Sequence, residues 1–112
     1  MQSNKKDNLK YFNMNNLLKR NYDSTVKRGK ITDNTRHIDF IDKIFEEYLE
    51  FKDNIYCKTY VDSIVKQDLK IHDIAIECTD IILTCLNYLV HSGYNPIELM
   101  EEKISINEKR ND

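Results

Sequence analysis

The sequence has 112 residues, which is the length of a single domain. Its 17 basic and 19 acidic side chains give a net charge of −2. This balance argues against a dedicated nucleic-acid binder, which usually presents a basic surface. The two glycines and one proline supply too few tight turns for a β-sandwich, a barrel or a doubly wound sheet, so the composition predicts an all-α fold.

The N-terminal part of the chain predicts a lead-in followed by a helix. Residues 1–8 are polar, lack the apolar segment of a signal peptide, and predict a flexible lead-in to one helical domain over residues 9–112. Apolar side chains recur three or four positions apart from Leu9 to Val26, which predicts a first helix that Gly29 ends and a loop after it.

The middle of the chain predicts a second helix from about Ile38 to Asn54 and a weaker, short helix within residues 55–70. A long helix follows over about 68–91. With a last helix at the C-terminal end, the prediction is a bundle of four or five helices without strands.

The long helix combines an apolar circumference with one polar seam. Because so apolar a helix needs cover and a chain of this size has little core, we expect a second copy to complete the bundle. The acidic residues in this helix argue against a membrane span. At 100° per residue the polar positions fall on one narrow line: Asp73, Glu77, Asp80, Thr84, Asn87 and His91. The alternative is that this line is simply the solvent-facing stripe of an amphipathic helix.

Two acidic pairs on different helices form a candidate metal site. Glu47 and Glu50 are one turn apart in the second helix, and Glu77 and Asp80 are one turn apart in the long helix. If the two helices are antiparallel, the four carboxylates can converge into a set of oxygen ligands that suits Mg²⁺ or Mn²⁺. The alternative is that each pair lies on a solvated helix face.

The last helix begins with Asn95 as its N-cap and Pro96 in its first turn, and it runs to about Arg110. Lys103, Asn107 and Arg110 lie at positions i, i+4 and i+7 on one face of this helix. These side chains can bind phosphate, although cations near a helix C-terminus are also stabilised by the helix dipole alone.

The three cysteines, Cys57, Cys78 and Cys85, are an odd number and form no C-x-x-C pair. Two of them lie in the apolar long helix, where small core residues are expected. We therefore expect reduced thiols and a cytoplasmic protein.

In combination these motifs resemble a known family. The order E-E-x-x-E at 46–50 and E-x-x-D at 77–80 is similar to the signature of the MazG-like all-α nucleoside triphosphate pyrophosphatases. The tail K-I-x-x-N-x-x-R at 103–110 is similar to the closing motif of that family. The resemblance covers residues 39–110, and it implies a four- to five-helix bundle completed by oligomerisation.

The resemblance implies a Mg²⁺-dependent hydrolase that cleaves a nucleoside triphosphate between the α and β phosphates, giving the monophosphate and pyrophosphate. The implied metal ligands are Glu47, Glu50, Glu77 and Asp80. Glu46 or Glu50 would orient or deprotonate the attacking water. The implied substrate contacts are Lys103, Asn107 and Arg110, with Asn87 and Arg28 as weaker candidates.

The expected partners are a nucleoside triphosphate and further copies of the same chain, as a homodimer or homotetramer, with neither a membrane nor a nucleic acid. The sequence leaves the base and sugar of the substrate open. A second interpretation keeps the fold without turnover: a helical dimer that binds nucleotide and metal as a sensor or interaction module. The third is a structural bundle whose acidic pairs face solvent.

Overall fold

The computed structural model describes the backbone of residues 13–61 and 67–111, and the side chains of 13–55 and 71–111. This part of the chain forms four helices and contains no strand, which confirms the all-α prediction. The helices are α2 (Met14–Lys27), α3 (His37–Val61), α4 (Gln67–His91) and α5 (Pro96–Glu108). The predicted lead-in at 1–8 lies outside the described residues.

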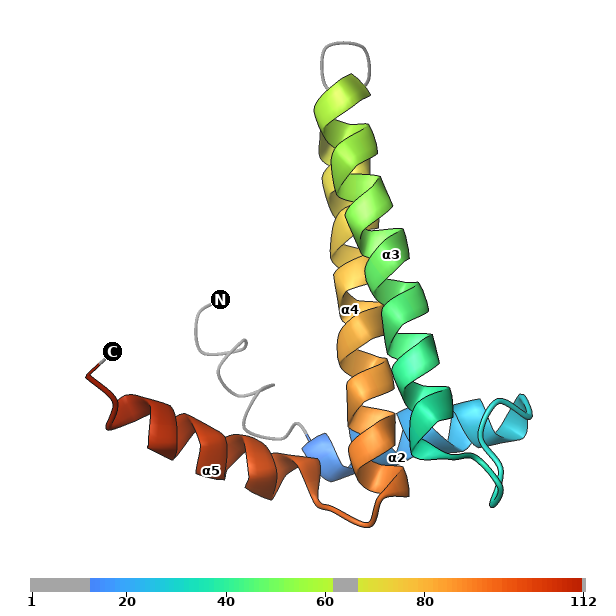
Figure 1. Cartoon of the computed structure of the whole chain (residues 1–112), viewed down its shortest axis with the longest axis vertical. Coiled ribbons are helices and arrows are strands. Elements are labelled where there is room, and N and C mark those ends of the chain that lie inside the picture. Colours follow the sequence, from blue (N-terminus) through green and yellow to red (C-terminus); the bar gives the residue numbers. More distant parts are fainter. Residues whose placement is uncertain (1–12, 62–66, 112) are drawn as a thin grey trace.

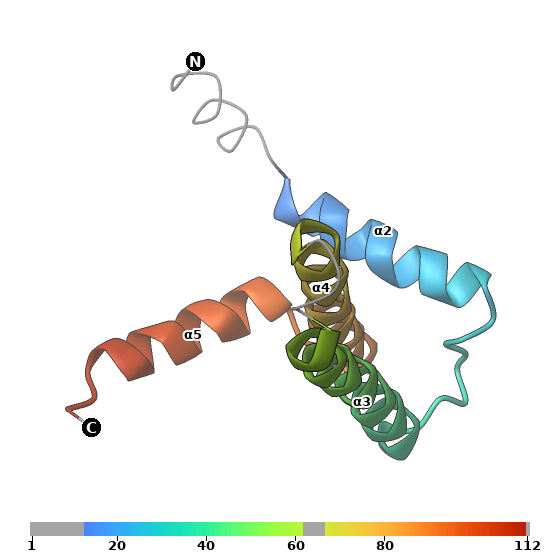
Figure 2. The same cartoon turned by 90° about the horizontal axis from the view of Figure 1, so that it is seen from above.

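Helices α3 and α4 run antiparallel, side by side, and form a long hairpin (Figure 1). Helix α2 crosses the base of this hairpin and packs on α4. Helix α5 leaves the same end and extends away from the hairpin, so that α2 and α5 point in different directions when the molecule is seen from above (Figure 2). The hairpin is therefore the frame to which the two shorter helices attach.

Two predicted helix boundaries were wrong. Helix α2 begins at Met14, not near Leu9, because the Asn13 side chain caps it by accepting a hydrogen bond from the Asn16 backbone N–H at 3.2 Å. Helix α3 does not end near Asn54 but continues to Val61. The separate helix predicted within 55–70 is therefore absent from the described residues: 55–61 belong to α3 and 67–70 to α4, while 62–66 lie outside them.

Both glycines of the chain end helices by the same mechanism. Gly29 follows α2 with φ +74°, and Gly93 follows α4 with φ +86°. In each turn the glycine and the next residue donate hydrogen bonds back to the last helical turn, as in a Schellman motif: Gly93 N–H to Val90 O at 3.0 Å and Tyr94 N–H to Leu89 O at 3.0 Å. The positive φ explains why glycine occupies both positions.

A small cluster at the base of the hairpin holds α2, α3 and α4 together. Phe40 of α3 is 5% exposed and packs against the rings of Tyr88 and His91 of α4. His91 Nε2 lies 3.1 Å from the carbonyl oxygen of Thr35, and its Nδ1 lies 2.7 Å from the hydroxyl of Tyr22. Because a carbonyl only accepts, a neutral ring satisfies both contacts when Nε2 donates to Thr35 and Tyr22 donates to Nδ1. His91 thus fixes the loop between α2 and α3.

Helix α4 is not buried within a single chain. The segment Ile71–His91 is long and apolar enough to cross a membrane by length and composition, but it also contains Glu77, Asp80 and Asn87. Asn87 is its one fully buried residue, and most of the others are half-buried or exposed. The expected burial of this helix therefore requires something beyond the described part of one chain.

Replacing Gly93 tests the turn after α4. A Cβ at Gly93 would have no atom within 4 Å, so a substitution there changes only the backbone preference. We expect Gly93→Ala to lower the free energy of unfolding by about 1–2 kcal/mol, because L-residues disfavour positive φ. Gly93→Asn should cost less, since asparagine tolerates this conformation. Urea unfolding measures both values, and an alanine variant as stable as the wild type would contradict the prediction.

Candidate metal centre

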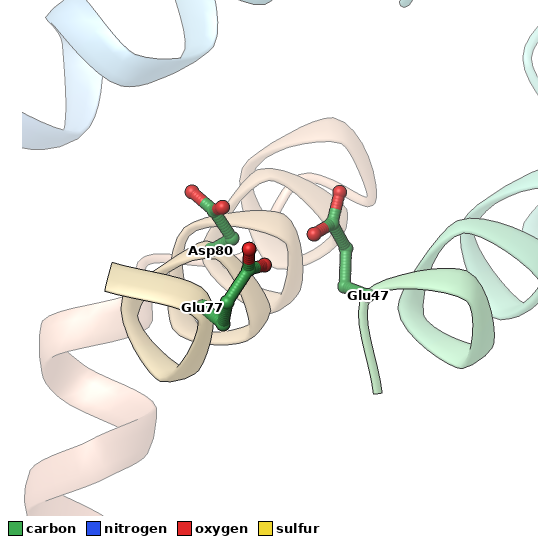
Figure 3. Close-up of side chains that lie close together, drawn as sticks. All are labelled: Glu47, Glu77 and Asp80. Atoms are coloured by element: carbon green, nitrogen blue, oxygen red, sulfur yellow. The ribbon is translucent and has the colours of Figure 1, made fainter. Parts of the chain in front are cut away.

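Three carboxylates from α3 and α4 meet across the hairpin. One carboxylate oxygen each from Glu47, Glu77 and Asp80 lies within 4.8 Å of the other two, and the side chains converge from the two helices (Figure 3). Glu77 and Asp80 share a face of α4 because they are three residues apart, and Glu47 faces them from α3. The structure thus brings together three of the four predicted metal ligands.

The cluster carries more negative charge than its surroundings neutralise. Glu47 is only 8% exposed, and its Oε2 atom is buried without a hydrogen-bond partner. Glu77 Oε2 is likewise buried and unpartnered. An unpaired carboxylate oxygen away from water is costly, and a cation would remove this cost by accepting all three oxygens as ligands. Carboxylate oxygens are hard donors of the kind that divalent cations such as Mg²⁺ bind.

Lys43 supplies a positive charge beside the cluster. It lies one turn before Glu47 on α3, and its Nζ atom is 3.0 Å from Glu47 Oε1 and 3.7 Å from Glu46 Oε1. The hydrogen bond to Glu47 raises the pKa of Lys43 above its ordinary value, so the ammonium stays charged. Glu47 therefore has one oxygen paired with Lys43 and the other without a partner.

The remaining two glutamates of the first motif lie at the edge of the cluster. Glu50 is exposed, yet the negative charge of Glu47 raises its pKa, with partial loss of solvent and the proximity of Glu77 as further causes. Glu46 is exposed and lies beside Lys43. Glu50 is thus electrostatically coupled to the cluster, although it is not one of the three converging residues.

A cavity of about 600 Å³ opens beside the carboxylates between α2, α3 and α4. Glu47 and Asp80 lie in its wall, and the cations Arg28, Lys30 and Lys43 also line it. This volume is in the range of small-molecule sites, and a wall with both carboxylates and cations suits a metal-bound anion. Arg28, a predicted substrate contact, therefore lines the same cavity as two of the predicted metal ligands, Glu47 and Asp80.

Asn87, another predicted substrate contact, lines this cavity but is 5% exposed and already hydrogen-bonded. Its Oδ1 accepts from Asn21 Nδ2 at 2.9 Å, and its Nδ2 donates to Thr25 Oγ1 at 3.1 Å. Asn21 Nδ2 also donates to the backbone of Leu83. Asn87 thus positions two polar residues of α2 in the cavity wall.

The predicted phosphate-binding tail is not brought to this cavity within one chain. Lys103 and Asn107 are exposed on α5, and Arg110 is exposed just beyond it. None of the three lines the cavity, and α5 extends away from the hairpin (Figure 1).

Several polar residues that line the cavity with Glu47 and Asp80 were not predicted from the sequence: Lys43, Lys30, Asn21 and Thr25. Lys43 could have been found, because a lysine four residues before a glutamate on a helix lies next to it. Asn21, Thr25 and Lys30 gave no such signal, since their position depends on how α2 crosses α4.

Comparisons with protein-family models, with curated proteins and with solved structures found no match to this chain. What the site can do therefore follows from its residues. Buried carboxylates with unpartnered oxygens can bind a divalent cation, and the adjoining cations can bind the negative charges of a phosphate.

The pKa of Glu50 is raised and that of Asp39 is lowered, so the two residues should affect the stability of the folded protein in opposite directions. A raised pKa means that ionised Glu50 destabilises the folded state, and this effect grows as the pH rises above about 4.3. Hydrogen bonds from Arg36 lower the pKa of Asp39, so its stabilisation is present at neutral pH and is lost in acid, below about pH 3.9.

In EDTA at pH 7 we expect Glu50→Gln to raise the melting temperature and Asp39→Asn to lower it. The Glu50→Gln difference should shrink as the pH is lowered to about 4. Thermal unfolding followed by circular dichroism at both pH values measures these shifts. A lower melting temperature for Glu50→Gln at pH 7 would contradict the repulsion from Glu47.

Metal addition tests the cluster itself. We expect Mn²⁺ to stabilise the wild-type protein by about 2.7 kcal/mol at one hundred times its dissociation constant. Glu47→Gln should lose most of this stabilisation because it removes a charged ligand. Asp53→Asn removes an exposed carboxylate from the same helix and serves as the matched control. Equal stabilisation of all three proteins would show general screening in place of a site.

Proposed function

We propose that this protein is a Mg²⁺-dependent nucleoside triphosphate pyrophosphohydrolase related to the MazG-like family. One observation carries the proposal: the buried Glu47 of α3 converges with the half-buried Glu77 and Asp80 of α4, and two of their oxygens are enclosed without partners beside a cavity lined by cations. A solvated acidic face would have neither the burial nor the cavity. The order of the acidic motifs and the C-terminal tail adds support from the sequence.

In the proposed reaction, a nucleoside triphosphate and water give a nucleoside monophosphate and pyrophosphate. Glu47, Glu77 and Asp80 would hold the metal, with Glu50 joining them from the edge of the cluster; Mn²⁺ would also fit. The metal would offset the charge of the phosphates and lower the pKa of a bound water.

Glu46 and Glu50 are the candidates for orienting or deprotonating the attacking water. Glu50 lies at the edge of the cluster, where repulsion from Glu47 and the proximity of Glu77 raise its pKa. Glu46 lines the cavity and lies beside Lys43, whose Nζ atom is 3.7 Å from Glu46 Oε1.

Arg28 is the candidate phosphate contact within the chain, because it lines the cavity with a charge that phosphate binds well. Asn87 would act on the substrate through Asn21 and Thr25, which its side chain holds in the cavity wall. The nucleoside would occupy the part of the cavity lined by α2 and α4.

The proposed active form is a homodimer or homotetramer. Helix α3 carries an apolar stripe whose residues are between 47% and 59% exposed: Ile38, Ile41, Phe45 and Tyr48. Their spacing of three or four residues puts them on one side of α3. A second copy would cover this stripe and could supply Lys103, Asn107 and Arg110 to the site.

A cytoplasmic location is part of the proposal because nucleoside triphosphates are cytoplasmic metabolites. Cys78 and Cys85 are free thiols, as a reducing compartment requires, and Cys57 lies outside the described side chains. Burial raises the pKa of Cys85, which favours its unreactive thiol form.

The proposal is tested by product release from a panel of ribo- and deoxyribonucleoside triphosphates with Mg²⁺ or Mn²⁺. We expect monophosphate and pyrophosphate in equal amounts. Glu50→Gln and Asp80→Asn should each lower kcat by about 100-fold or more. Asp53→Asn is the matched control and should retain wild-type turnover.

Three outcomes would contradict the proposal in different ways. Orthophosphate as the first product would mean that a different bond is cleaved. No turnover with strong joint stabilisation by metal and nucleotide would favour a non-catalytic sensor or interaction module. No turnover and no stabilisation would leave a structural bundle.

A further inference from the structure

Lys43 touches the candidate metal centre from outside the set of carboxylates. Its ammonium lies 3.0 Å from Glu47 Oε1, within hydrogen-bond distance, and the two residues are one turn apart on α3. The exposure of the two side chains is unequal: about half of the Lys43 side chain reaches solvent, but only 11% of the Glu47 side chain does. The pair therefore joins a half-exposed cation to an almost fully enclosed carboxylate.

The two carboxylate oxygens of Glu47 differ in their hydrogen bonding. Oε1 accepts from Lys43, whereas Oε2 is buried without a partner. The carboxylate that carries both oxygens faces Glu77 and Asp80 (Figure 3). A carboxylate held by one oxygen has a restricted rotation, so its other oxygen keeps a fixed direction. Ligating carboxylates generally need such an outer hydrogen bond to keep their orientation.

From this division we infer that Lys43 is a positioning residue of the metal centre: it holds Glu47 by Oε1 so that Oε2 is presented to the cation. The inference rests on the proposed function only for the presence of a metal ion. It assigns a role to a residue that would otherwise count as a surface ion pair, since Lys43 also contacts exposed Glu46 at 3.7 Å.

Electrostatics and positioning predict opposite effects for the loss of Lys43. A positive charge near a cation repels it, so removing the charge would tighten metal binding if Coulomb forces alone decided. Loss of an orienting hydrogen bond weakens metal binding, typically by 10–100-fold. The sign of the change therefore separates the two roles.

The experiment measures the dissociation constant of Mn²⁺ by electron paramagnetic resonance for the wild type, Lys43→Met, Lys43→Arg and Lys30→Met. Methionine keeps the helix propensity and the length of the side chain but cannot donate to Glu47. Arginine retains a donor and a charge. Lys30 is a cation of the same cavity whose side chain forms no described bond to the cluster, so its replacement controls for charge.

We expect Lys43→Met to weaken Mn²⁺ binding by about 10-fold or more and Lys43→Arg to remain within about 3-fold of the wild type. Lys30→Met, which removes only a charge, should leave binding unchanged or slightly tighter. Unchanged or tighter binding by Lys43→Met would overturn the inference while leaving the metal centre intact. Wild-type protein that binds no Mn²⁺ would overturn both the inference and the proposed function. Circular dichroism of each variant in EDTA verifies that the helices are retained.

Discussion

The contact between α3 and α4 is the constraint on which the rest of the structure depends. It places Glu47 against Glu77 and Asp80 and encloses oxygens of two of these residues without partners. Such burial opposes folding unless a positive charge compensates it, and Lys43 pairs with only one oxygen of Glu47. The hairpin therefore has a local charge imbalance that a divalent cation would correct, and this imbalance is the main reason to consider the hairpin a site.

The base of the hairpin positions the loop that carries basic residues of the cavity wall. Phe40 and His91 fix the loop between α2 and α3, and Arg28 and Lys30 lie where that loop begins. The cavity therefore has one wall of acidic residues on the hairpin and one wall whose position depends on a small aromatic cluster. Ring packing and the hydrogen bond from His91 to Thr35 thus help to position the basic part of the cavity wall.

Sequence periodicity was sufficient for the features that depend on helix geometry alone. The all-α fold, the end of α4 at Gly93 and the shared face of Glu77 and Asp80 follow from 3.6 residues per turn and from turn chemistry. The extent of α3 was not predictable in this way, because weak apolar patterning after Asn54 does not stop a helix that contains neither glycine nor proline. The place of α2 beside the cluster was also missed, since it depends on tertiary packing.

Because the cluster is built from two continuous helices, its tolerance to change differs between substitutions and changes in length. Adding or removing one residue between Glu77 and Asp80 would rotate one carboxylate by about 100° relative to the other and turn it out of the hairpin. Substitutions at the intervening positions 78 and 79 would leave this register intact. The spacing within each helix is thus under stricter geometric control than the identity of the residues between the ligands.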